Sequence, residues 1–218
     1  MKLSRYIGLL GVLIFLSGTC SYAQDRKLAP SIKGDFKLPV ATSTKAFRDI
    51  NDGVIDIDLV GQYPFESGFM LGIGAKVTYF EINDLALTPE VTEGDNTGWG
   101  VYGKVGYEKR TGASSFLEFA MNLGYSSYNY STRQCEKNSS TDGFFFEPRI
   151  GLYLFATEQL AFGIITSYQF VYQDFGQEQL CLETLPRHDD ADTEGTIGIF
   201  TIGLGFSTGL TKNSSVFR

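Results

Sequence analysis

Hydrophobic and polar residues alternate along most of the chain, which is the pattern of β-strands that have one apolar and one polar face. In one clear stretch the odd positions from 99 to 107 are Trp, Val, Gly, Val and Tyr, whereas the even positions from 100 to 108 are Gly, Tyr, Lys, Gly and Glu. The pattern predicts eight strands, at 33–41, 53–63, 68–81, 98–110, 114–130, 143–155, 159–172 and 195–208.

The connections between these strands alternate between short and long. The tight turns are 64–67, 111–113 and 156–158, and the long polar loops are 42–52, 82–97, 131–142 and 173–194. A tilted strand needs about 9 to 11 residues to cross a bilayer, and all eight strands reach this length. Turns at one end and loops at the other are typical of outer-membrane barrels. The predicted fold is all-β: an eight-stranded antiparallel up-and-down transmembrane β-barrel.

The sequence resembles the small eight-stranded outer-membrane barrels of the OmpA/OmpX-like superfamily, in the "outer membrane β-barrel protein" version of Bacteroidota. The resemblance covers roughly residues 33–210. It rests on the alternating strands, on Gly-Phe-Met-Leu-Gly-Ile-Gly at 68–74 and on Ile-Gly-Leu-Gly-Phe at 202–206. These features imply the fold, the bacterial outer membrane as the location and outer-membrane lipid as a partner, but they carry little information about activity.

The N-terminal segment has the order of a secretory signal peptide. Lys2 and Arg5 precede an apolar stretch at 7–16, and Ala23 ends a short run that suits cleavage. Lipoprotein processing at Cys20 is the alternative, but the residues before this cysteine do not fit such a site. The predicted domains are a signal peptide at 1–23 and a single outer-membrane barrel at 24–218.

Charge and cysteine content narrow the function classes. The formal net charge is −7, and it becomes −9 without residues 1–23, so the chain is a poor candidate for nucleic-acid binding. Cys135 and Cys181 remain after cleavage, both in polar loop-like sequence. Two thiols in an oxidising compartment form a disulfide more often than a metal site. We predict a bridge between two loops.

The charged residues on the polar faces of the strands help to decide which face points into the barrel. Acidic strands are flanked by basic ones, so the charges can pair inside a closed barrel. The predicted interior charge network consists of Lys37, Asp56, Asp58, Lys76, Lys104, Glu118, Glu147 and Arg149. A soluble, lipocalin-like barrel with its apolar face inward is the alternative. Two groups of outward aromatic residues favour the membrane barrel. They are Tyr63, Phe69, Tyr107, Phe162 and Phe206 near the turns, and Tyr79, Trp99, Phe144, Phe170 and Tyr172 near the loops.

An eight-stranded barrel is just wide enough for its own side chains, so we expect a filled interior and no channel. Above the charges, an apolar layer is predicted from Phe80, Tyr102, Tyr128, Tyr130, Phe145, Val171, Ile197 and Ile199. Core packing explains this layer, and a small apolar ligand pocket under loop 173–194 is the alternative.

Candidates for chemistry are few. His188 is the only histidine, and we expect an exposed loop residue. Some small outer-membrane barrels are lipid A acylases or deacylases that use a histidine and a serine, but no serine lies in the 185–190 run. The acidic run 190–195 matches the start of a calcium loop, but Thr201 stands where a bidentate glutamate is expected. No cofactor is predicted.

The expected function is therefore non-enzymatic: a structural or interaction subunit of the cell envelope, with other outer-membrane proteins as candidate partners. The alternative is a lipid-modifying enzyme, or a small apolar ligand binder, that uses the upper interior of the barrel.

Overall fold

A computed structural model describes residues 30–87, 94–112, 114–133, 135, 139–188, 193 and 195–210. The strands are β1 Ser31–Ala41, β2 Asn51–Pro64, β3 Phe69–Ile82, β4 Gly94–Arg110, β5 Ser115–Thr132, β6 Ser139–Phe155, β7 Leu160–Tyr172 and β8 Ile197–Gly209. The described parts of the loops contain three short helices: α2 Lys45–Ile50, α3 Asp84–Leu87 and the 3₁₀-helix η1 Gln177–Leu180. No helix in these ranges is long and apolar enough to cross a membrane.

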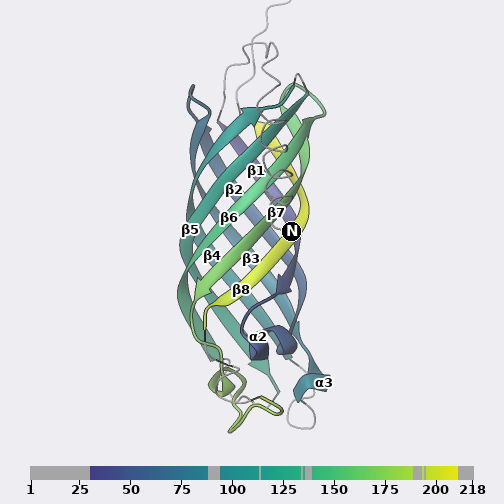
Figure 1. Cartoon of the computed structure of the whole chain (residues 1–218), viewed down its shortest axis with the longest axis vertical. Coiled ribbons are helices and arrows are strands. Elements are labelled where there is room, and N and C mark those ends of the chain that lie inside the picture. Colours follow the sequence, from purple (N-terminus) through teal and green to yellow (C-terminus); the bar gives the residue numbers. More distant parts are fainter. Residues whose placement is uncertain are drawn as a thin grey trace, which may run out of the picture.

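The eight strands form one closed antiparallel barrel in sequence order, which confirms the predicted fold class (Figure 1). Closure is made by β1 and β8, which pair from Ser31 with Gly209 to Ala41 with Ile199. The Leu210 amide also donates to the Pro30 carbonyl at 2.8 Å. Closure leaves no strand with an unpaired edge, which is what a sheet needs when no water can satisfy its backbone groups.

Turns and loops lie at opposite ends of the barrel, as predicted (Figure 1). The turn between β2 and β3 places Gly68 at a φ of +88°, a conformation that a residue without Cβ adopts readily. At the other end, α2 folds into the barrel mouth, with Ala46, Phe47 and Ile50 completely buried. This helix was not predicted.

Two strands begin four residues earlier than predicted. β4 starts at Gly94 and β6 at Ser139, and the residues predicted as loop there pair with the end of β5, Gly94 with Thr132 and Ser139 with Tyr130. These extensions are polar on both faces. Hydrophobic alternation therefore ends before the strand does, because the hydrogen-bond ladder continues beyond the apolar belt.

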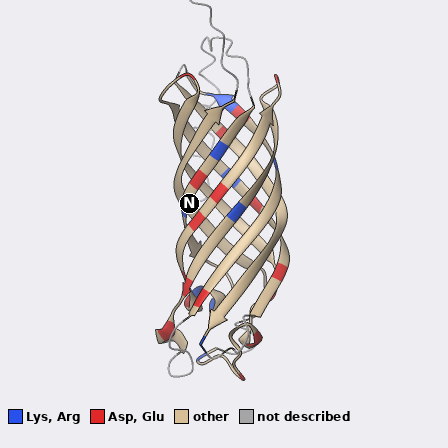
Figure 2. Cartoon of the chain, turned by 180° about the vertical axis from the view of Figure 1, so that it is seen from behind, with Lys and Arg blue, Asp and Glu red and all other residues tan. Residues whose placement is uncertain are grey.

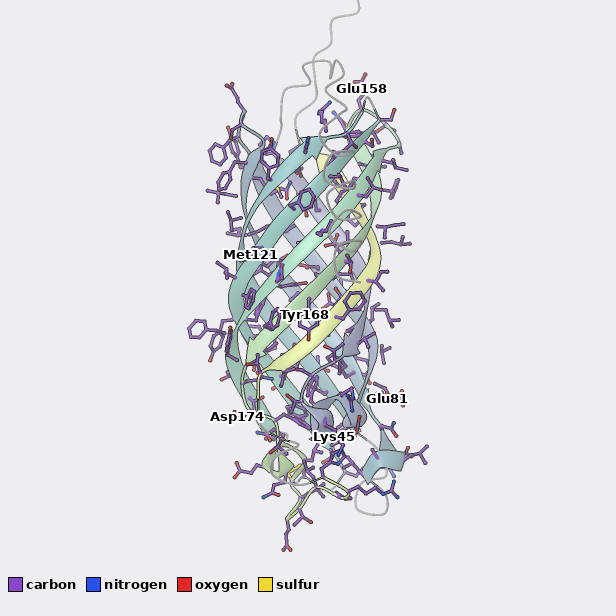
Figure 3. All side chains as sticks on the ribbon, viewed as in Figure 1. Lys45, Glu81, Met121, Glu158, Tyr168 and Asp174 are labelled. Carbon is purple, nitrogen blue, oxygen red and sulfur yellow. A yellow bond between two sulfur atoms is a disulfide. The ribbon has the colours of Figure 1, made fainter. Side chains whose placement is uncertain are left out.

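The two faces of the wall differ in the way expected for a membrane barrel. Apolar side chains radiate outward from the wall, and many are about half exposed (Figure 3). Near the turns they include Tyr63 and Phe162, and near the loops they include Trp99, Phe144 and Tyr172. The polar faces point inward. This arrangement is opposite to that of the soluble, lipocalin-like alternative.

Candidate functional site

Among the described residues, ten charged side chains in the interior of the barrel are almost completely shielded from solvent. Five are cations and five are carboxylates: Lys33, Lys37, Lys76, Lys104 and Arg149, with Asp35, Asp56, Asp58, Glu118 and Glu147. Figure 2 shows blue and red positions interleaved on the strands along the barrel. All eight residues of the sequence-predicted network face this interior.

Nearest the turns, Glu118 is the centre of a cluster. Its carboxylate accepts from Lys33, from Lys104 at 2.9 Å and lies 3.1 Å from Nε of Arg149. Lys33 also pairs at 2.5 Å with Glu108, whose side chain is 15% exposed. One carboxylate from β5 therefore joins cations from three other strands.

Lys33 lies between aromatic rings as well as between carboxylates. Its Nζ is 4.9 Å from the centroid of Phe116 and 4.6 Å from that of Tyr153. The two rings stack on each other with centroids 4.8 Å apart. The interior is thus closed on the turn side by packed rings, and the ammonium group gains the attraction of their π-faces.

At mid-height, Arg149 links two carboxylates that face each other. Asp35 on β1 and Asp58 on β2 are direct cross-strand partners, and two like charges in this position repel. Arg149 on β6 donates to Asp35 at 2.7 Å and lies 3.7 Å from Asp58. Asp58 also accepts from the Tyr102 hydroxyl and from Lys37 at 3.3 Å. The repulsion is therefore offset from the far side of the interior.

Toward the loops, two lysines and two carboxylates form a closed ring of ion pairs. Lys37 lies 2.9 Å from Asp56 and 3.3 Å from Glu147, and Lys76 lies 3.2 Å and 3.1 Å from the same two carboxylates. Glu147 also accepts from Ser167 at 2.5 Å. The ring joins β1, β2, β3 and β6, and Ser167 connects it to β7.

Side chains therefore fill the barrel at its waist. Burying an unpaired charge costs several kcal/mol, and pairing with additional hydrogen bonds offsets this cost. Equal numbers of shielded cations and carboxylates meet that requirement. The same pairing places these groups against one another rather than in an open space, so the waist is suited to bracing the wall and not to conducting ions.

The upper interior is filled by the predicted apolar layer and by parts of the loops. All eight predicted residues of this layer are at most 5% exposed. Phe47 of α2 inserts among them, with its ring centroid 5.7 Å from that of Phe80 and 5.3 Å from that of Phe175. Leu180 of η1 and Leu185 join the same cluster. In this part of the chain, helix α2 and loop residues occupy the position predicted for an apolar ligand.

The predicted disulfide is confirmed. Cys135 in the β5–β6 loop is bonded to Cys181, which directly follows η1. Leu180, the neighbour of Cys181, is completely buried under the loops. The bond therefore fastens the long β7–β8 loop to the neighbouring hairpin. We call α2, η1 and residues 181–188 the loop cap.

His188 belongs to the loop cap, and the prediction that it is exposed is wrong. Its side chain is only 5% exposed, and Nε2 lies 3.6 Å from the Asp49 carboxylate. Nδ1 lies 2.8 Å from the Pro186 carbonyl oxygen. The loop folds back over the end of α2, which covers the ring. Both ring nitrogens thus have partners, and neither is a serine hydroxyl.

The acidic run 190–195, whose match to a calcium loop lacks the expected glutamate, falls outside the described residues except for Thr193 and Gly195. Within the described ranges, no group of three or more His, Cys, Asp or Glu side chains is arranged to hold a metal ion. The predicted signal peptide at 1–23 also lies outside these ranges.

Sequence reasoning missed several members of the network. Lys33 and Asp35 share the inward face of β1 with Lys37, because all three occupy odd positions. Glu108 lies on the same face of β4 as Lys104, and Gln62 bridges these two side chains at 2.7 Å and 2.9 Å. Extending the period of two to the strand ends would have found them.

Comparisons with known proteins identify the fold but no close relative. No family model matches the chain, and no curated protein matches it. The crystal structure of Neisserial surface protein A (NspA) is 9% identical, covers 83% of this chain and 97% of that chain, and has a TM-score of 0.55. That of the outer membrane protein OprG from Pseudomonas aeruginosa is 11% identical, covers 86% and 100%, and has a TM-score of 0.56.

Both neighbours are outer-membrane proteins, and at this level of identity the likeness concerns the fold. The narrower resemblance to the Bacteroidota version stays a prediction. The apolar outer face of the wall, its aromatic groups near both ends and the asymmetry of turns and loops agree with these neighbours. The chain therefore has the fold of the eight-stranded outer-membrane β-barrels, and the bacterial outer membrane remains its predicted location.

Proposed function

We propose that the protein is a non-enzymatic, closed barrel that serves as a structural or interaction subunit of the cell envelope. The observation that carries this proposal is the filled interior. Paired charges occupy the waist, aromatic and aliphatic side chains occupy the layer above, and α2 occupies the mouth. A barrel filled in this way acts through its surfaces.

The surface best suited to an external partner is the loop cap. The disulfide and the buried side chains of Phe47 and Leu180 hold the cap in one arrangement. A partner that binds a pre-ordered surface loses less conformational entropy than one that must first order flexible loops. The cap thus supports a role as a subunit of a larger outer-membrane assembly, with other outer-membrane proteins as partners.

A pulldown in gentle detergent tests this role. We expect the tagged protein to return envelope proteins in stoichiometric amounts. The matched control carries Cys135→Ser and Cys181→Ser, which leave the barrel wall unchanged but release the cap. Loss of the partners from this control supports binding through the cap. A wild-type protein that returns no envelope protein after mild crosslinking in cells contradicts the proposal.

The alternative function, a lipid-modifying enzyme, has one feature in its favour. The Asp49 carboxylate and the His188 ring are adjacent, as an orienting acid and a base are in many hydrolases. The contact is long, however, and Nδ1 is directed to a backbone carbonyl. In the described part of the chain, the contacts of the two ring nitrogens are with Asp49 and Pro186, and neither of these residues is a nucleophile for such a reaction.

A further inference from the structure

One part of the lipid-facing wall has a shape unlike the rest. Ile73 on β3 is 78% exposed, the largest exposed fraction among the described large hydrophobic residues. Its direct cross-strand partners are Gly61 on β2 and Gly103 on β4. All three face outward, so a protruding isoleucine stands between two positions that have no side chain. We call this row the Ile73 ridge.

The notches beside the ridge are open. A Cβ atom built on Gly61 would meet nothing within 4 Å, and one built on Gly103 would meet only the Leu123 carbonyl oxygen at 4.0 Å. A hollow of about 800 Å³ lies here, lined by Gly61, Ile73 and Gly103 and bordered by apolar side chains such as Leu71 and Val105. The surface thus combines a knob with recesses next to it.

Other outward glycines of the barrel are covered from within the chain. The Phe206 ring lies over Gly34, where an added Cβ would come within 2.5 Å of it, and the Tyr168 hydroxyl lies over Gly198 at 2.3 Å. The two glycines beside Ile73 are therefore exceptional, because no side chain of the described chain fills them.

Shape matters more than apolarity on a surface that faces lipid. Hydrocarbon chains are as apolar as the protein wall, so association in a bilayer depends on close packing, and small residues permit it. Isoleucine is β-branched and stiff, so it loses little freedom when a neighbour packs around it. Ala75, the next outward residue on β3, adds a further small position beside the ridge.

We propose that the Ile73 ridge is a docking surface for a second copy of this chain. A knob beside a recess is self-complementary. Under a two-fold axis along the membrane normal, the isoleucine of each copy enters the recess of the other, and both copies keep their loops on the same side. Phe69 and Tyr79 mark the two ends of the outward face of β3, so the contact lies within the apolar belt. This inference goes beyond the proposed function, since a dimer through the wall leaves the loop cap free.

Sedimentation equilibrium in density-matched detergent micelles tests the proposal. We expect a monomer–dimer equilibrium for the full chain. Ile73→Ala removes the knob, and Gly61→Leu combined with Gly103→Leu fills the recesses. Each change should weaken dimerisation at least tenfold. The matched control is Ile164→Ala on β7, which removes the same group from a residue that is 61% exposed elsewhere on the wall.

The added leucine side chains have space on the outer face of the barrel. Heat-modifiable migration on gels verifies that each variant is folded. A wild-type protein that stays monomeric at every protein-to-detergent ratio overturns the proposal. So does a dimer whose dissociation constant is the same in both ridge variants. Native mass spectrometry tests whether a lipid occupies the recess instead. A monomer that retains a lipid, and loses it in the variant with filled recesses, would assign the recess to an acyl chain and overturn the proposed dimer. None of these results depends on whether the cap binds a partner.

Discussion

Arg149 reaches across the interior from β6 to donate a hydrogen bond of 2.7 Å to Asp35 on β1, two strands that are not neighbours in the barrel. Asp35 is itself the direct cross-strand partner of Asp58. Asp35 on β1 and Asp58 on β2 repel each other, and the guanidinium group of Arg149 offsets this repulsion because it lies near both carboxylates. This contact explains why a planar, always charged side chain occupies the position.

Replacing Arg149 should destabilise the barrel strongly. Arg149→Met leaves Asp35, Asp58 and Glu118 without one of their cations, and breaking a buried charge pair costs about 3–5 kcal/mol. Urea unfolding in lipid vesicles, followed by Trp99 fluorescence, measures the loss in the free energy of unfolding. Arg48→Met is the control, because its pair with Asp49 is exposed and contributes about 1 kcal/mol or less. Equal effects of the two changes would contradict the account.

Removing a cation and a carboxylate together should cost less than removing the cation alone. Arg149→Met combined with Asp35→Leu keeps the interior charge balanced and replaces two polar groups by apolar ones of suitable size. We expect the double variant to recover at least about 1.5 kcal/mol of unfolding free energy relative to Arg149→Met. Additive losses in the double-mutant cycle would show that charge balance does not govern stability here.

Much of this architecture was accessible from the sequence, because a wall with one face in lipid imposes a strict period of two on each strand. Side chains such as Lys104 and Glu147 could be assigned to the interior from parity alone. Partners across the interior could not, because the contact of Lys37 with Glu147 depends on the tilt and stagger of a closed barrel. The position of a residue in the sequence gives neither the tilt nor the stagger.

The loop end was less predictable for a different reason. The short helix α2 is held by burial of Phe47 against Phe80 and Phe175, residues far away in sequence. Tertiary contacts rather than local propensity therefore decide its conformation. The burial of His188 has the same origin, since the ring is covered only when its loop folds onto the end of α2.

Opening the disulfide should loosen the loop cap without unfolding the barrel. The bond between Cys135 and Cys181 joins the β5–β6 loop to the β7–β8 loop. In the folded barrel the disulfide constrains only these two loops, because β6 and β7 remain paired with their neighbouring strands. We expect trypsin to cleave after the exposed Arg187 about tenfold faster, or more, in the Cys135→Ser, Cys181→Ser variant. Unchanged cleavage, with strand protection intact in both, argues against a fastened cap.

Replacing His188 should leave the composition of lipid A unchanged. In cells that produce the His188→Ala variant, the mass spectrum of lipid A is expected to match that from cells with the wild-type protein and from a deletion strain. The physical reason is that both ring nitrogens contact the protein itself. A lipid A species that disappears in the deletion strain and in the variant alike would establish an enzyme.

The central claim, that the interior is closed and the protein works through its surfaces, is tested most directly by ion conductance of the purified protein in planar lipid bilayers. A porin inserted into the same bilayers provides the positive control, and the reduced protein separates closure by the cap from closure by the waist. We expect no steady conductance in either redox state, because the ion pairs of Lys37, Lys76 and Arg149 remain when the cap is released. A steady, voltage-independent conductance of the oxidised protein would contradict the account.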